Sequence, residues 1–199
     1  MLDPFLNEFL VSVEMPIMIE EKTYVIVEQE LIPNIMTLIY QYGVANLKYS
    51  DIFDGTAYED NSGKGPILVQ LSNENESFSQ LVQLFSKQPS GCFLQTDLVF
   101  SDLLDWVRNA LNVNFNNKIS LFRFYEPRML LALLGSLTFN EKSHFFKDIH
   151  SVYWFHHAWL GYHHVPDPSI KEDDFILTLT EEHLAKINSV QQRYLELLN

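Results

Sequence analysis

Residues 118–137 of this 199-residue chain, KISLFRFYEPRMLLALLGSL, constrain its fold more than any other stretch. Residues 119–125 are rich in β-branched and aromatic side chains, which favour a strand. Pro127 disfavours helical geometry at Glu126, so we expect the strand to end there. A proline fits the first turn of a helix, and residues 129–134 are apolar on nearly all sides. The stretch therefore predicts a strand that leads directly into a buried core helix.

Charged side chains flank this predicted junction. Alternation along a strand places Arg123 on the same face as Leu121 and Tyr125, so its guanidinium needs an acceptor. Glu126 is the nearest acidic residue in the sequence, and we predict a structural ion pair that fixes the turn. The functional alternative is a site in which Arg123 and Arg128 together bind an anionic group.

The charge balance narrows the classes of partner. The chain has 13 Lys and Arg against 26 Asp and Glu, a formal net charge of −13. This charge argues against binding to nucleic acid or to an anionic membrane, and it favours a basic partner. Cys92 is the only cysteine, which excludes an intramolecular disulfide and fits a reducing cytoplasm. No apolar run reaches the roughly 18 residues of a membrane span, and the N-terminus lacks a basic secretion signal. We therefore expect a cytoplasmic protein.

Strand-like and helix-like patterns alternate along the rest of the chain. We predict short apolar strands at residues 23–27, 67–71, 91–95 and 176–179. We predict helices after Pro33, at residues 98–111, from Thr138 with a capping box to Glu141, and from Thr180 to the end. Helical crossovers between strands favour parallel pairing. The fold class we expect is α/β, a single domain over residues 1–199 with a central mixed, partly parallel sheet flanked by helices.

The histidines are the chain's candidates for a metal site. Six of the seven histidines lie within residues 144–164, but their spacing matches no familiar zinc motif. On a strand, His156 and His157 point to opposite faces, as do His163 and His164, so few of them converge. The chain also lacks a GxSxG nucleophile turn and a glycine-rich phosphate loop. We predict no catalytic residue, no metal and no cofactor.

A resemblance to a known family adds to this interpretation. The segments LFRFYEPRMLLALLGSL and TFNEKSHFF resemble the signature of bacterial type VI secretion effector adaptors, also called effector chaperones of the Tap or Tec type. The arginine–aromatic–tyrosine–acid–proline–arginine core of that family corresponds here to Arg123, Phe124, Tyr125, Glu126, Pro127 and Arg128, with Glu where Asp is commoner. YVIVEQ, YSDIFDGTAYED followed by GPILVQL, GCFLQTDL and ILTLTEEHLAKI resemble further pieces in the same order. One departure is LLDWVRNAL, where many members carry a basic, histidine-containing helix.

The resemblance implies a non-catalytic adaptor that holds a secreted effector and helps to load it onto the VgrG spike. Residues 22–150 would form the family-like scaffold, and residues 151–199 a divergent segment plus the C-terminal helix. Two alternatives stay open. One is an immunity-type inhibitor that binds a toxin, and the other is a hydrolase that uses the histidines with a metal.

Residues 152–174 match the family pattern least, so we expect them to select the cargo. Trp154, Trp159 and Tyr162 are side chains of the kind that anchor protein interfaces. Asp173 and Asp174 lie in an acidic loop that would steer a basic effector segment toward them. The alternative is that these aromatic rings belong to the core.

Overall fold

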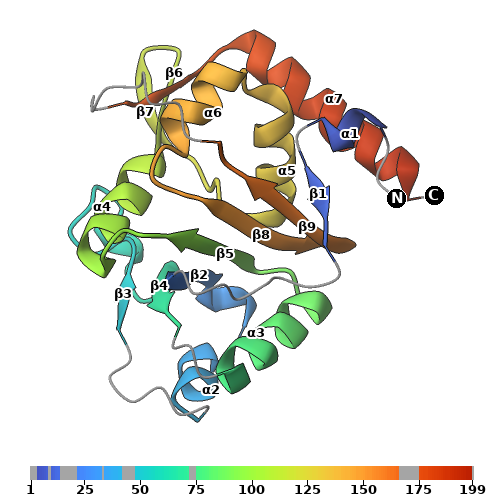
Figure 1. Ribbon diagram of the computed structural model, residues 1–199. Coiled ribbons are helices and arrows are strands. Elements are labelled where there is room, and N and C mark those ends of the chain that lie inside the picture. The colour runs from blue at the N-terminus through green and yellow to red at the C-terminus, as the bar shows by residue number, and fades with distance from the viewer. Residues whose placement is uncertain are drawn as a thin grey trace.

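The computed structural model describes residues 4–8, 10–13, 22–32, 34–41, 48–71, 75–165 and 175–198. A seven-stranded sheet runs through the middle of the molecule in the order β1-β9-β8-β5-β2-β4-β3 (Figure 1). Its strands are β1 (Val11–Ser12), β2 (Lys22–Glu28), β3 (Tyr49–Asp51), β4 (Pro66–Gln70), β5 (Gly91–Thr96), β8 (Ser151–His156) and β9 (Ala158–His163). Each neighbouring pair is antiparallel.

The prediction of a partly parallel central sheet is therefore wrong, although the chain is a mixed α/β protein. β4 and β5 run in the same direction, because both pair antiparallel with β2. Helix α3 (Asn75–Lys87) connects them, as a crossover helix should. β2 occupies the place between them, which makes the unit a split βαβ arrangement.

A second sheet of three strands contains parallel pairing. Its order is β10-β6-β7, built from β6 (Asn112–Phe115), β7 (Lys118–Leu121) and β10 (Leu177–Leu179). β10 pairs parallel with β6, and β6 forms an antiparallel hairpin with β7. Asn116 and Asn117 connect the hairpin with positive φ values of 51° and 60°, as a two-residue type I′ turn requires.

Both faces of the large sheet are covered, which gives three layers (Figure 1). Tyr24 and Ile26 of β2 face a core shared with α4 (Phe100–Ala110), α5 (Pro127–Ser136), α6 (Phe139–Phe145) and α7 (Glu181–Leu197). Val25 and Val27 face a second core with α2 (Ile35–Gln41) and α3. Burial on both faces explains why residues 24–27 in the middle of β2 are apolar without alternation.

The remaining elements are short, namely α1 (Pro4–Asn7) and the 3₁₀ turns η1 (Gln29–Leu31) and η2 (Glu59–Asn61). None of the helices in the described part of the chain combines the length and apolarity that a membrane crossing requires.

The prediction of a strand that leads into a buried helix at residues 118–137 is partly correct. Helix α5 begins at Pro127 and is buried along most of its length, as predicted. The strand before it is shorter than predicted, because β7 ends at Leu121. Residues 122–126 form a tight turn instead, in which the Glu126 N–H donates to the Arg123 carbonyl at 3.1 Å. The capping box of Thr138 with Glu141 is confirmed.

Candidate functional site

The turn between β7 and α5, which we call the signature turn (residues 122–128), is anchored by Glu28 at the end of β2. The Tyr125 hydroxyl donates a 2.9 Å hydrogen bond to Glu28 Oε2, and Arg123 Nη1 lies 3.6 Å from the same oxygen. The Glu28 side chain is 9% exposed, whereas that of Arg123 is 54% exposed. The prediction that Arg123 pairs with Glu126 is therefore wrong, and its guanidinium is not buried.

The hydroxyl of Tyr125 is held in its donor state. Burial, together with the charge and hydrogen bond of Glu28, raises the pKa of Tyr125 above its ordinary value. The phenol therefore stays protonated at neutral pH and can donate to the carboxylate. The bond joins residues 97 positions apart and ties the signature turn to a central strand.

Glu126 and Arg128 form a separate contact at the start of α5. Glu126 is the N-cap residue, and its Oε2 accepts a 3.1 Å hydrogen bond from the Met129 N–H. Its Oε1 accepts from Arg128 Nε at 2.8 Å. Arg123 and Arg128 thus each pair with a different carboxylate, which disfavours a shared site for an anionic group.

The centre of the signature turn carries Phe124, which is fully buried. Its ring packs edge-on against Trp106 of α4, with centroids 5.5 Å apart, and against Phe145 of α6 at 5.7 Å. The Trp106 indole Nε1–H donates to the Phe145 carbonyl at 3.1 Å. The turn therefore supports two aromatic side chains that line a surface groove.

This groove, which we call the α4–α6 groove, has a volume of about 500 Å³. It lies between α4, the end of α6 and the residues that lead into β10, with Ile119 of β7 also lining it. Helix α4 contributes Asp102, Asp105, Trp106 and Asn109. This spacing puts them on one helical face, because side chains three and four residues apart are neighbours.

The rim of the α4–α6 groove is acidic. Asp102 and Asp105 are exposed on the α4 side, and Asp148 lies on the α6 side. Lys147 is close to Asp148, with Nζ 3.8 Å from Oδ2, so that cation is already partly neutralised. This site could not be predicted from the sequence, because its residues come from four separated segments. The spacing of Asp102, Asp105 and Trp106 was the one local signal.

The aromatic residues predicted to select cargo lie elsewhere. The strand-like run at residues 152–164 is a hairpin of β8 and β9, with His157 in the turn at a φ of 61°. Trp154, Trp159 and Tyr162 are all buried, which corrects the expectation that they form a displayed surface. Burial raises the pKa of Tyr162 to about 12. Asp173 and Asp174 lie outside the described residues.

The histidines are distributed rather than gathered. The turn brings the rings of His156 and His157 within 4.9 Å of each other, so the prediction of opposite faces is wrong for this pair. Burial, and then the nearby His157, lower the pKa of His156 to about 4. His163 Nδ1 lies 2.9 Å from the Ser151 hydroxyl on the neighbouring strand. Across the residues that the structure describes, no three His, Cys, Asp or Glu side chains are placed to hold a metal ion.

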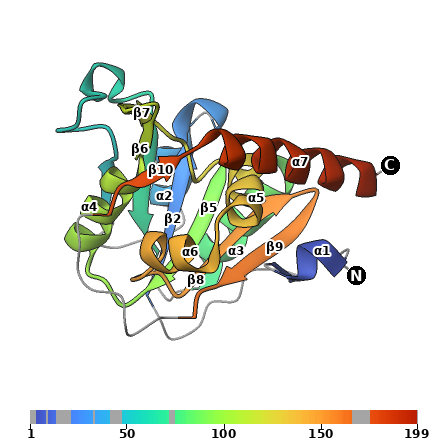
Figure 2. The same cartoon turned by 90° about the horizontal axis from the view of Figure 1, so that it is seen from above.

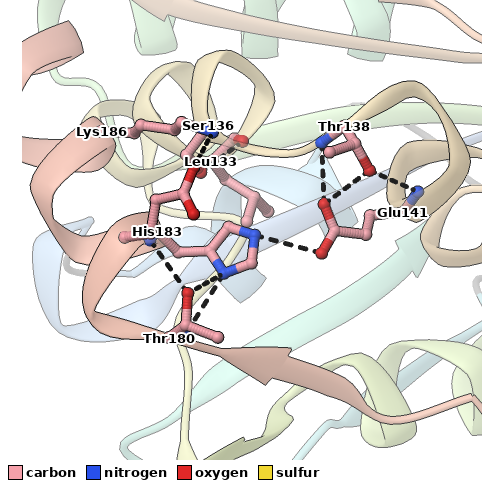
Figure 3. Close-up of polar contacts among 8 residues, drawn as sticks. Leu133, Ser136, Thr138, Glu141, Thr180, His183 and Lys186 are labelled. Atoms are coloured by element: carbon pink, nitrogen blue, oxygen red, sulfur yellow. Dashed lines mark hydrogen bonds and ion pairs between the residues drawn. The ribbon is translucent and has the colours of Figure 1, made fainter.

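A hydroxyl, an imidazole and a carboxylate do line up where α6 meets α7 (Figure 3). His183 Nδ1 lies 2.9 Å from the Thr180 hydroxyl, and Nε2 lies 3.1 Å from Glu141 Oε1. Burial works to raise the pKa of Glu141, but hydrogen bonds from Thr138 and His183 outweigh it and lower this pKa. We call this set, Thr138, Glu141, Thr180 and His183, the α6–α7 clasp.

The α6–α7 clasp has the hydroxyl–imidazole–carboxylate order of contacts found in a hydrolase triad. Its residues, however, are the N-terminal caps of α6 and α7. The Thr180 hydroxyl accepts the His183 backbone N–H, and the Thr180 backbone N–H donates to His183 Nδ1. The side chains of Thr180 and His183 therefore each accept a hydrogen bond from a backbone N–H at the start of α7. Glu181 and Glu182 lie in the same first turn, where their charges would oppose a developing oxyanion. We interpret the clasp as a structural link between the two helices.

Comparison with known proteins identifies one family. A family model described as a domain of unknown function (DUF4123) matches residues 23–144, which is more than half of the chain. The matched range contains Glu28, the signature turn and the whole of α4. Comparisons with curated proteins and with solved structures give no match.

Proposed function

The chain belongs to the DUF4123 family, and from this premise we propose that it is a non-catalytic adaptor. In this role it binds a type VI secretion effector in the bacterial cytoplasm and helps to load it onto the VgrG spike. The observation that carries the proposal is that the family match coincides with the adaptor-like signature, including Arg123, Tyr125 and Glu126.

The chemistry of the described residues supports binding rather than catalysis. The buried carboxylate of Glu28 and the phenol of Tyr125 are used to anchor a turn. The thiol of Cys92 lies in the core, where burial raises its pKa and keeps it protonated and unreactive. The α4–α6 groove offers an apolar floor and an acidic rim, which suit a protein partner.

The test is a secretion assay in the native bacterium, combined with co-purification. Deleting the gene should stop delivery of the effector encoded beside it, while delivery of other type VI cargo continues. The tagged chain should co-purify with that effector and with VgrG from the same cells. A control strain that carries the wild-type gene on a plasmid should restore delivery.

Two results would count against the adaptor proposal. One is normal effector delivery in the deletion strain. The other is that the purified chain neutralises the activity of a toxin encoded beside it, which would support the immunity-type inhibitor instead.

A further inference from the structure

We propose that the α4–α6 groove is the surface that receives the effector. Its occupant is a segment of the effector in which a lysine or arginine lies next to an aromatic or aliphatic anchor. This inference rests on the adaptor function proposed above and names the chemistry of its cargo contact.

Exposed apolar side chains converge on the groove. Ile119 is 57% exposed and Ile176 is 48% exposed, although both are aliphatic and both line the same groove. Phe175 lies beside them, with its ring stacked on that of His144 at 5.1 Å. Water-exposed aliphatic and aromatic surface of this kind is buried favourably by an apolar partner side chain.

The rim of the groove carries carboxylates that a basic partner side chain can pair with. Asp102 accepts a hydrogen bond from the neighbouring Ser101 hydroxyl at 3.0 Å, and Asp105 makes no ion pair with any described residue. Their side chains stand three residues apart on one face of α4, so one basic side chain can reach both. The net charge of −13 adds a long-range attraction for a basic segment.

The size and support of the groove fit a short segment. Pockets of roughly 300–1,000 Å³ enclose a drug-sized ligand. This groove has about 500 Å³, which is room for a few side chains of a partner. Its floor is rigid, because Trp106 is held by its hydrogen bond to the Phe145 carbonyl and by the ring of Phe124. A preorganised floor lowers the ordering cost of binding. The signature turn thereby contributes to binding without contacting the cargo.

Two single substitutions separate the charged and the apolar contributions. Both Asp105→Lys and Ile119→Asp change exposed side chains, so each variant should melt close to the wild type. The control is Glu196→Lys near the end of α7, which changes the charge by the same amount as Asp105→Lys. That end of α7 lies on the opposite side of the molecule from α4 (Figure 2).

The readout is the dissociation constant for the effector encoded beside the gene, measured by calorimetry with each purified variant. Asp105→Lys should weaken binding about 2- to 30-fold, because one exposed ion pair is lost and one repulsion is gained. Ile119→Asp should weaken it about 10-fold through lost apolar burial, even though it adds negative charge. Glu196→Lys should bind like the wild type.

A peptide array of the effector identifies the bound segment. The peptides that bind the wild-type chain should contain lysine or arginine beside an aromatic or aliphatic residue, and should lose binding to Asp105→Lys. If the wild-type chain binds the effector and both groove variants bind it equally well, the groove proposal is overturned while the adaptor function stands. If the wild-type chain does not bind the effector, both proposals fail. Array peptides that are acidic or purely polar would also overturn the groove assignment.

Discussion

Removing one hydroxyl, in Tyr125→Phe, should destabilise the protein more than removing the charged side chain in Arg123→Ala. The Tyr125 hydroxyl donates at 2.9 Å to a Glu28 carboxylate that is only 9% exposed. A hydrogen bond to a charged group contributes about 1.5–3 kcal/mol to stability. A buried acceptor that loses its donor bears the full free-energy penalty of its desolvation. The Arg123 pair is longer, at 3.6 Å, and its guanidinium is half exposed. Such a pair contributes about 0–1 kcal/mol.

The assay is urea denaturation at pH 7 with thermal melting alongside. A loss of about 2 kcal/mol in Tyr125→Phe should lower the melting temperature by about 4–8 °C for a chain of this size. Tyr49→Phe is the matched control, because its hydroxyl contacts the exposed side chain of Tyr40 at the sheet edge rather than a buried acceptor. A double-mutant cycle with Glu28→Gln should return a coupling energy of about 1 kcal/mol or more between the two side chains.

A larger loss of stability in Arg123→Ala than in Tyr125→Phe would contradict this prediction. That result would make the ion pair the principal anchor of the signature turn. Equal melting of Tyr125→Phe and Tyr49→Phe would also contradict it, since the buried hydroxyl would then contribute no more to stability than an exposed one.

Glu126→Ala should lower the free energy of unfolding by about 0.5–2 kcal/mol in urea denaturation, because α5 loses its N-cap. Glu126→Asp should keep most of that stability, and equal losses in the two variants would refute the capping role. The pKa of His156 is lowered to about 4, against about 6.5 in an unfolded chain, so acidification through this range protonates the unfolded state first and destabilises the fold. The wild type should therefore lose about 1–2 kcal/mol more stability than His156→Gln between pH 7 and 4.5, and parallel pH profiles of these two proteins would contradict this. His157→Gln should lose less than the wild type, because it removes the smaller cause of the shift, but more than His156→Gln. His183→Ala should remove the contact to Glu141 and speed amide hydrogen exchange in the first turn of α7; unchanged exchange would show that the α6–α7 clasp is not needed there.

Strands and helices that depend on a few neighbouring residues were predicted from short sequence patterns. The β-branched run before Glu28, the proline at residue 127 and the Thr138 and Thr180 caps each act within a few residues. Their strands and helices appear close to where the sequence placed them. The Asn116–Asn117 turn was an equally local signal that the sequence analysis overlooked, and with it the hairpin of β6 and β7.

The errors arise where distant segments decide the outcome. Alternating strands and helices do not reveal that β2 inserts between β4 and β5, which makes the large sheet antiparallel. The hairpin of β8 and β9 turns at His157, a residue without the usual glycine or asparagine cue. The partner of Arg123 and the residues of the α4–α6 groove are likewise far apart in sequence.

The bond between Glu28 and Tyr125 also sets an order of events on the ribosome. The two residues are separated by 97 positions, so the tyrosine is synthesised about 5–20 s after the glutamate at rates of about 5–20 residues per second. Until then the end of β2 has its carboxylate in water, even if β4 and β5 have already paired with it. We expect the nascent chain to remain open at this corner, accessible to protease or chaperone, until the signature turn emerges and closes it.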